Sequence, residues 1–270
     1  MVIDHHQADY ISPYACVVNN QLCDYPNKSL SGVGVVYKVC QRLDALMGTE
    51  YADDYIDVVM LGLVGDMMDI RNYETKYLIK QGLTHIRNPF IKGMAEKNSY
   101  SLGSQLTPIG VAFYIVPLVN AVTRVGTQDE KELLFTSMLE WRSFDLVPST
   151  KRGCSGQTET IVEQAVRTCT NVKNRQTRSQ DAAVEAIETY IQNNNLLDHK
   201  LLIVKLDSSF KIDPTIRGLI ANKFMAKYQR PVGLLTYVPD EDAWMGSARG
   251  YEKSKLTDFR QFCRNSGLVF

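Results

Sequence analysis

The first part of the chain alternates short apolar runs with polar turns, a pattern typical of strands and helices that pack together. Residues 1–4 predict the end of a buried strand, and residues 15–19 predict a second short strand. Residues 27–31 supply turn and N-cap residues. Apolar side chains then recur at helical spacing over residues 33–43, which predicts an amphipathic helix.

A longer apolar stretch follows, in residues 52–64, and its helical pattern ends at Gly65 and Asp66. The next apolar stripe, over residues 77–86, predicts another helix, which we expect to end at Pro89 because proline lacks the amide hydrogen that a continuing helix needs. Residues 107–122 form a further apolar stretch that ends at residues 120–124, and residues 129–140 predict another amphipathic helix.

The second half of the chain has a different texture. Residues 157–195 are polar with sparse apolar positions, and they predict one long exposed helix, or two. Strand and helix patterns then return in the order strand, helix, strand, short strand, helix, at residues 201–206, 215–228, 231–237, 243–248 and 255–264.

These elements predict two α/β units joined by a helical linker, because strands and helices alternate on both sides of the polar segment. We place the first domain at residues 1–145, the linker at 146–197 and the second domain at 198–270. Hydrophobic residues make up 44% and charged residues 22% of the 270 residues, values typical of a globular protein.

Charge neither requires nor excludes a nucleic-acid partner. Lys plus Arg equals Asp plus Glu at 30 each, so any basic surface must be local and balanced elsewhere. The six cysteines include no CxxC pair, which predicts reduced and mostly buried thiols rather than a disulfide framework or a zinc site.

Targeting features are also absent from the pattern. No apolar run approaches the ~20 residues of a membrane span, and Asp4, His5 and His6 stand where the apolar core of a signal peptide would begin. We therefore expect a cytoplasmic protein without a membrane partner. Because the chain begins as if inside a strand, we also expect that it is incomplete on this side.

Asp4, His5 and His6 are the first candidate metal ligands. They follow an apolar strand, and α/β sheets place ligand sites at the carboxyl ends of their strands. Asp66 is the second candidate, since it ends an apolar run between glycines that let the backbone approach closely. Carboxylate and imidazole together suit Mn²⁺, Mg²⁺ or Zn²⁺. The alternatives are a tag remnant or a solvated turn for the triplet, and an ordinary helix N-cap for Asp66.

Three further segments carry groups that can contact phosphate. Residues 31–34 combine Ser and two glycines at a helix start, Asn120 and Arg124 offer an amide and a guanidinium, and residues 246–250 combine glycine, hydroxyl and guanidinium. Tight packing, a polar loop and a β-turn are the respective alternatives. The basic residues Lys151, Arg152, Arg167, Lys173, Arg175 and Arg178 alternate with acidic ones and favour a solvated helix face over a phosphate track.

The order of these segments resembles the RecJ-like nucleases of the DHH phosphoesterase family. Val2–His6 resembles the Asp-His-His motif that names the family, and Ala15–Asn19 with Leu30–Lys38 resembles the "VVNP … LSGVGVAFK" stretch. Leu61–Asp69 is similar to "LGTIADVVPL", and Ile115–Gly126 to "PRLNAAGRLG".

The C-terminal part is similar to the DHH-associated domain of that family. Arg217–Lys223 resembles its "GIVASR" helix start, Arg230–Val232 its "GRP" strand entry, and Gly246–Arg249 its "GSGRS" motif. The resemblance implies a truncated DHH domain with a parallel sheet and many helices, a long helical linker and a smaller, incomplete α/β DHH-associated domain.

The resemblance also implies roles for individual residues. Asp4, His5 and Asp66 would belong to a two-metal centre of Mn²⁺ or Mg²⁺, and His6 would face the scissile phosphate, so His6 and Asp66 are the expected catalytic residues. Single-stranded DNA would be held by five residues: Asn120, Arg124, Gly246, Ser247 and Arg249. The implied reaction is 5′ to 3′ exonucleolytic hydrolysis of single-stranded DNA in repair, recombination or replication.

Two departures from the family pattern limit this reading. The carboxylate motifs that precede the Asp-His-His motif in the family are missing before Asp4, and the chain stops before the family's Gly-His-rich motif. We therefore expect a separate or upstream segment to supply the missing metal ligands, and the isolated chain to be inactive or nearly so. Two alternatives remain open at this stage: another DHH phosphodiesterase acting on short oligonucleotides or cyclic dinucleotides, and a non-catalytic DHH-type scaffold.

Overall fold

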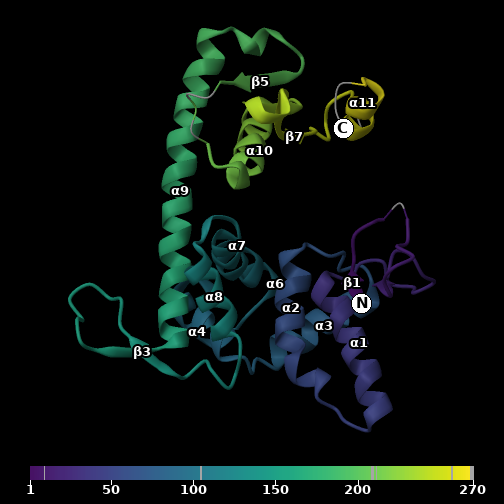
Figure 1. The fold of residues 1–270 in the computed structure, drawn as a ribbon, viewed down its shortest axis with the longest axis vertical. Helices are drawn as coiled ribbons and strands as arrows, with labels where there is room; N and C mark the ends of the chain where they lie inside the picture. The colour runs from purple at the N-terminus through teal and green to yellow at the C-terminus, as the bar shows by residue number, and fades with distance from the viewer. Residues whose placement is uncertain (9, 104, 208–209, 211, 257, 268–270) are drawn as a thin grey trace. The chain divides into compact units, whose positions relative to one another are not determined.

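The computed structural model describes residues 1–8, 10–103, 105–207, 210, 212–256 and 258–267 (Figure 1). The chain forms two compact units, Met1–Asn171 and Val172–Phe270. The division falls within a single long helix, α9 (Ile161–Asn193), which contributes residues to both units.

The first unit begins with a parallel pair of strands, β1 (Val2–Asp4) and β2 (Val17–Asn19). Both predicted strands are therefore confirmed, but the prediction that the first is buried is wrong, since Val2 is 49% exposed. The reason is that β1 has one neighbouring strand among the described residues, which leaves its other edge uncovered.

Helix α1 (Gly32–Met47) follows the strands and begins where the turn residues predicted. Its N-cap is Ser31, whose hydroxyl accepts a hydrogen bond from the Gly34 amide. The helix ends at Gly48, which adopts the left-handed conformation (φ +69°) that a residue without a side chain adopts at little cost.

Helix α2 (Ile56–Gly65) forms the centre of the first unit, after a 3₁₀ turn at Ala52–Tyr55. Its side chains Met60 and Leu63 are fully buried. A Cβ atom on Gly62 would lie 2.2 Å from Val33 Cγ1, so the missing side chain is what lets α1 approach α2.

Helices α3 (Tyr73–Thr84) and α4 (Pro89–Lys97) pack next along the chain. The prediction that Pro89 closes a helix is wrong, because α3 ends at Thr84 and Pro89 is instead the first residue of α4. Proline suits that position because the first amide of a helix has no intrahelical acceptor. Asn88 provides the N-cap, accepting from the Phe90 amide at 3.0 Å.

A continuous helical stretch from Pro108 to Val125 follows the short helix α5 (Ser99–Leu102). It consists of α6 (Pro108–Gly110), a π-helical segment at Val111–Ile115 and α7 (Val116–Val125). By length and composition this stretch could cross a membrane, which the sequence pattern did not predict. Length and composition alone are weak evidence for a span, and Val111, Ile115, Ala121 and Val122 are buried as in a core helix.

Helix α8 (Gln128–Ser137) begins with a capping box between Thr127 and Glu130. An antiparallel hairpin that the sequence did not predict then joins β3 (Leu146–Pro148) to β4 (Thr158–Thr160). The polar break around Gly153 forms the loop of this hairpin, and β4 leads directly into α9.

The second unit is built on the sheet β5 (Leu202–Leu206), β6 (Val232–Val238) and β7 (Ala243–Arg249), in that order. Strands β5 and β6 run parallel, and β7 is antiparallel to β6. All three strands are confirmed. Helix α10 (Arg217–Tyr228) connects β5 to β6 and packs against β6 and β7, and α11 (Phe259–Asn265) follows the sheet.

All six cysteines are free, as expected, but the prediction that they are mostly buried is wrong. Cys169 on α9 is buried, and its surroundings raise the pKa of its thiol to about 12, whereas Cys16 and Cys23 are exposed in the loops around β2.

Candidate metal centre

The candidate centre lies at the carboxyl end of the parallel strand pair. Asp4 is the last residue of β1, and it stands opposite Asn19, the last residue of β2. His5 and His6 follow directly and lie outside the strand, so all three polar side chains stand at its carboxyl end. The sequence prediction that the triplet follows a strand is confirmed.

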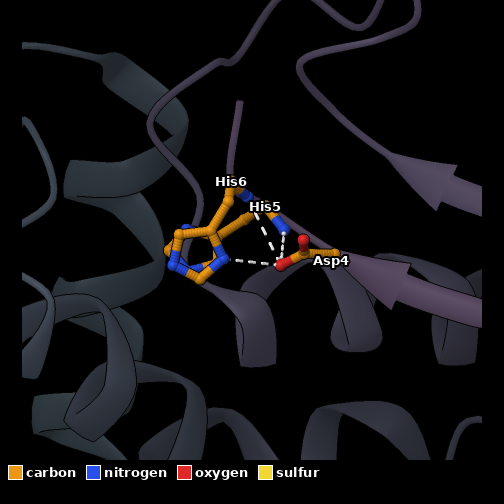
Figure 2. A group of neighbouring side chains, drawn as sticks. All are labelled: Asp4, His5 and His6. Atoms are coloured by element: carbon orange, nitrogen blue, oxygen red, sulfur yellow. Dashed lines mark hydrogen bonds and ion pairs between the residues drawn. The ribbon is translucent and has the colours of Figure 1, made fainter. Parts of the chain in front are cut away.

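One oxygen of Asp4 organises the triplet, as Figure 2 shows. Asp4 Oδ1 accepts the backbone amide of His5 at 2.7 Å and lies 2.8 Å from His6 Nδ1. The hydrogen bond with the His6 ring, followed by the bond from the His5 amide, lowers the pKa of the Asp4 carboxyl below its ordinary value. Asp4 is therefore a carboxylate at neutral pH.

Asp66 joins the triplet from a distant part of the chain. It caps the carboxyl end of α2, and its Oδ2 atom lies 3.8 Å from His5 Nε2. The His5 side chain is 16% exposed and that of Asp66 is 49% exposed, so Asp66 is open to solvent. Helix α1 lies next to both partners of this contact. It packs closely against α2 at Gly62, and a Cβ on Gly32, at the start of α1, would lie 3.6 Å from His5 Cδ2.

The donor set fits a divalent ion. One ligand atom from each of Asp4, His5 and His6 lies within 4.8 Å of the others, and Asp66 adds a second carboxylate beside His5. Imidazole and carboxylate ligands suit Mn²⁺, and carboxylates with water suit Mg²⁺. The arrangement can hold an ion between a strand end and a helix end, with exposed room for an anionic ligand at His6, whose side chain is 75% exposed.

Asn19 supports the backbone of the triplet, a role that was not predicted from the sequence. Its Nδ2 atom donates to the His6 carbonyl oxygen at 2.8 Å, and its Oδ1 atom accepts from the Gln21 amide at 2.7 Å. Asn19 is only 5% exposed, so both bonds are shielded. Its position at the end of the second predicted strand could have identified it, because neighbouring parallel strands end at the same edge of a sheet.

Residues 31–34 have a packing role in the structure. Ser31 is fully buried and caps α1, and a Cβ on Gly34 would lie 3.3 Å from Leu30 and 3.4 Å from Leu63. The tight helix packing that the sequence allowed as an alternative is therefore present at this segment.

Asn120 and Arg124 lie on helix α7 and not in a polar loop. Arg124 is exposed near the end of the helix, and within the part of the chain that the structure describes neither side chain contacts the Asp4–His6 triplet through a hydrogen bond or ion pair. Their predicted contact with nucleic acid stays a prediction.

Gly246, Ser247 and Arg249 lie on β7 in the second unit. Arg249 Nη1 donates to the Ala248 carbonyl at 2.7 Å, and a Cβ on Gly218 would lie 2.4 Å from Arg249 Nη2 and 3.6 Å from Ser247 Oγ. Gly218 is in the first turn of α10, so a hydroxyl, a guanidinium and a helix N-terminus meet here. These three groups are suited to binding phosphate.

No protein-family model matches this chain. The chain is 37% identical, over 99% of its length, to the SPbeta prophage-derived protein YorK of Bacillus subtilis strain 168, which is named as a single-strand DNA-specific exonuclease. It is 25% identical over 98% of its length to the single-stranded-DNA-specific exonuclease RecJ of the same organism. The chain spans 46% and 31% of these two relatives, less than half of each.

The fold leads to the same group of proteins. A crystal structure of exonuclease RecJ bound to manganese superposes with a TM-score of 0.67 at 19% identity, covering 87% of this chain and 54% of that one. The strand-end Asp-His-His cluster and the two compact units therefore occur in a chain that is similar, along nearly its whole length, to proteins named as single-strand DNA-specific exonucleases. Its fold is similar to that of the solved RecJ structure.

Proposed function

We propose that the protein hydrolyses phosphodiester bonds of single-stranded DNA with a divalent metal ion, as a 5′ to 3′ exonuclease. The observation that carries the proposal is the convergence of Asp4, His5, His6 and Asp66 at one strand end, in a chain 37% identical to a protein named as a single-strand DNA-specific exonuclease. The printed activity is that of the relative, and the proposal extends it to this chain.

The residues present would divide the work as follows. Asp4, His5 and Asp66 would hold Mn²⁺ or Mg²⁺, which when bound would supply an activated water and stabilise the leaving oxygen. His6, exposed and hydrogen-bonded to Asp4, is placed to contact the scissile phosphate. The Asp4 carboxylate would orient the His6 ring as well as bind metal, because its Oδ1 atom is hydrogen-bonded to His6 Nδ1.

The donor count supports a partner segment. Asp4, His5, His6 and Asp66 offer four side-chain donors, whereas two divalent ions with about six ligands each require more. Water and DNA phosphate can fill some positions, and we propose that carboxylates of a separate or upstream segment fill others. On this basis the 270-residue chain alone has little or no activity.

Single-stranded DNA is the proposed substrate. In the second unit the proposed phosphate-binding groups are Ser247 and Arg249 with the backbone at Gly246, and in the first unit they are Asn120 and Arg124. Ser247 and Arg249 adjoin the start of α10, where amide hydrogens point outward. We further propose that the protein acts in the cytoplasm in DNA repair, recombination or replication.

The test is a hydrolysis assay on a single-stranded oligonucleotide labelled at its 3′ end, with and without Mn²⁺. It compares the 270-residue chain alone, the chain combined with the proposed partner segment, and the Asp66→Ala variant of that combination. We expect metal-dependent release of mononucleotides from the 5′ end by the combination, little or none by the chain alone, and loss of this release in Asp66→Ala. A combination that binds the oligonucleotide without hydrolysing it in Mn²⁺ or Mg²⁺ would contradict the proposal and favour a scaffold role.

A further inference from the structure

A hollow of about 630 Å³ lies in the first unit between α4, the hairpin β3–β4 and the first turns of α9. Its apolar part includes Val162 and Val166, two side chains of α9 that are otherwise buried. A Cβ on Gly93 of α4 would lie 3.1 Å from a methyl of each valine, so the absence of a side chain there lets the two helices form a shallow apolar base. The volume is within the range of sites that bind one small ligand or one nucleotide.

The rim of the hollow carries more cations than carboxylates. Four basic side chains line it: Lys92, Lys97, Lys151 and Arg167. Two carboxylates also line it, and one of them, Glu163, accepts hydrogen bonds from the Thr160 amide and hydroxyl. Glu159 pairs with Lys151 and Arg167, which reduces the excess to one positive charge. The positive charge that favours an anionic occupant is therefore that of Lys92 and Lys97.

The cations on the hairpin side are held in position. Arg167 donates to both carboxylate oxygens of Glu159 and to Thr150 Oγ1, and Lys151 Nζ lies 3.4 Å from Glu159 Oε2. The Glu159 side chain is 2% exposed, so this network ties the hairpin to α9. By contrast, Lys92 and Lys97 are exposed, and among the described residues the structure records no ion pair for either. They are available to an external anion.

An exposed aromatic ring completes the hollow. Phe144 lines it while remaining 67% exposed. The neighbouring Ser143 is fully buried and held in place by two hydrogen bonds. Its hydroxyl donates to the Glu140 carbonyl, and its own carbonyl accepts a bond from the Val162 amide. The Phe144 ring is therefore presented to solvent from an anchored backbone.

We propose that this hollow is a second contact surface for single-stranded nucleic acid, in which a base stacks on Phe144 and phosphates pair with Lys92 and Lys97. An aromatic platform beside a row of cations is the combination that binds single strands without sequence preference. The inference rests on the proposed function, because it takes single-stranded DNA as the substrate. It adds a binding surface on α4 and α9, whereas the candidate metal centre lies at the ends of β1 and α2. Figure 1 shows α4 beside the start of α9, with β1 on the other side of the same unit.

The first experiment measures binding of a fluorescein-labelled oligo(dT) by anisotropy in EDTA, so that binding is separated from hydrolysis. The variants are Lys92→Glu with Lys97→Glu, and Phe144→Ala. The matched controls are Lys76→Glu with Lys80→Glu, exposed lysines on α3 with the same charge change, and Phe135→Ala, a ring 66% exposed on α8. Circular dichroism confirms that each variant folds.

We expect the lysine pair to weaken binding at least tenfold at low salt and to reduce the salt slope by about 1.4, since each phosphate contact of a single strand contributes about 0.7. Phe144→Ala is expected to weaken binding about fivefold or more with an unchanged slope, as loss of a stacked base predicts. Equal losses in the controls, or changes under twofold in the variants, would overturn the inference.

A second readout locates the contact directly. Photocrosslinking with an oligonucleotide containing 5-iododeoxyuridine is expected to label the tryptic peptide 143–151, which contains Phe144. Labelling confined to other peptides would refute the nucleic-acid assignment. So would a sedimentation experiment in which the unchanged protein self-associates and Phe144→Ala does not, because the hollow would then bind a second copy of the chain. Because all of these measurements omit metal, they fail or succeed independently of the hydrolysis assay.

Discussion

His5 Nε2 lies 3.8 Å from Asp66 Oδ2, although the two residues come from a strand end and from the carboxyl end of a central helix. A histidine after a strand and an aspartate after a helix are each common, but this contact brings the two side chains together in one site. An imidazole and a carboxylate at this separation can share one ion or form an ion pair, and the Asp4 carboxylate beside them favours the ion.

Removing either member of this pair is expected to reduce metal binding. His5→Ala and Asp66→Ala should each weaken Mn²⁺ binding by more than about tenfold, because even outer-shell changes cost 10–100-fold at metal sites. Electron paramagnetic resonance of free Mn²⁺ measures this. His85→Ala, which removes an exposed imidazole at the end of α3, is the control and should bind as the unchanged protein does. Equal affinity in all three variants would contradict the site.

Asn19 should affect the metal centre through position alone. Asn19→Ala removes the donor to the His6 carbonyl and the acceptor of the Gln21 amide without adding a charge beside the metal ligands. We expect about tenfold weaker Mn²⁺ binding and a loss of about 1 kcal/mol in the free energy of unfolding. Titration calorimetry and urea denaturation measure the two effects. A stability loss with unchanged metal affinity would show that Asn19 is structural only.

Gly62 should be intolerant of a methyl group. Gly62→Ala places a Cβ 2.2 Å from Val33 Cγ1, and we expect a loss of about 1–3 kcal/mol in urea denaturation. Adding Val33→Ala should recover part of the loss, because the two positions are in contact. Gly65→Ala on the same helix meets only Val116 at 3.8 Å and should be close to neutral. An additive double variant would contradict the close-approach argument.

Acid should weaken the anchoring of the hairpin through Glu159. Hydrogen bonds from Arg167, followed by those from Gln164 and the Thr150 amide, lower the pKa of the Glu159 carboxyl far below its ordinary value. A carboxylate with a depressed pKa stabilises the fold above its unfolded pKa of about 4.3, and this contribution is lost as the pH falls below that value.

The matching variant is Glu159→Gln. We expect it to cost about 2–3 kcal/mol at pH 7, and to flatten the decline in unfolding free energy between about pH 5 and pH 3. Denaturation curves at several pH values measure both effects. Glu140→Gln, at an exposed position, is the control. A pH profile identical to that of the unchanged protein would rule out Glu159 as the group responsible.

Arg249 should contribute one phosphate contact to DNA binding. Arg249→Ala is expected to weaken oligo(dT) binding and to lower the salt slope by about 0.7, whereas Arg260→Ala on α11 should change neither. Gly218→Ala should act in the same direction, because its Cβ would displace the Arg249 guanidinium. Anisotropy titrations at several salt concentrations measure these effects, and an unchanged slope in Arg249→Ala would contradict the contact.

Much of the fold could be predicted because the apolar spacing has a physical period. The strand β5, for example, buries Leu202, Val204 and Leu206 and exposes the residues between them, as a period of two requires. The hairpin β3–β4 was not predicted, because each strand has only three residues, too few to show a period of two, and because its contacts with α9 are made by residues distant in the sequence pattern, such as Arg167 with Glu159 and Gln164 with the Pro148 carbonyl. Pro89 was misassigned for a related reason, since proline is compatible with a helix start as well as a helix end.

The chain by itself determined which donors are available and roughly where they stand: an Asp-His-His triplet after a strand, a carboxylate after an apolar run, and a guanidinium near glycine and serine. Local periodicity and capping chemistry suffice for this, because they depend on neighbouring residues. Tertiary structure decided that Asp66 meets His5 and that Asn19 supports His6. It also decided that Phe144 stands exposed beside Lys92 and Lys97. Those relationships depend on how closely helices pack, as at Gly62 and Gly93, which no local pattern specifies.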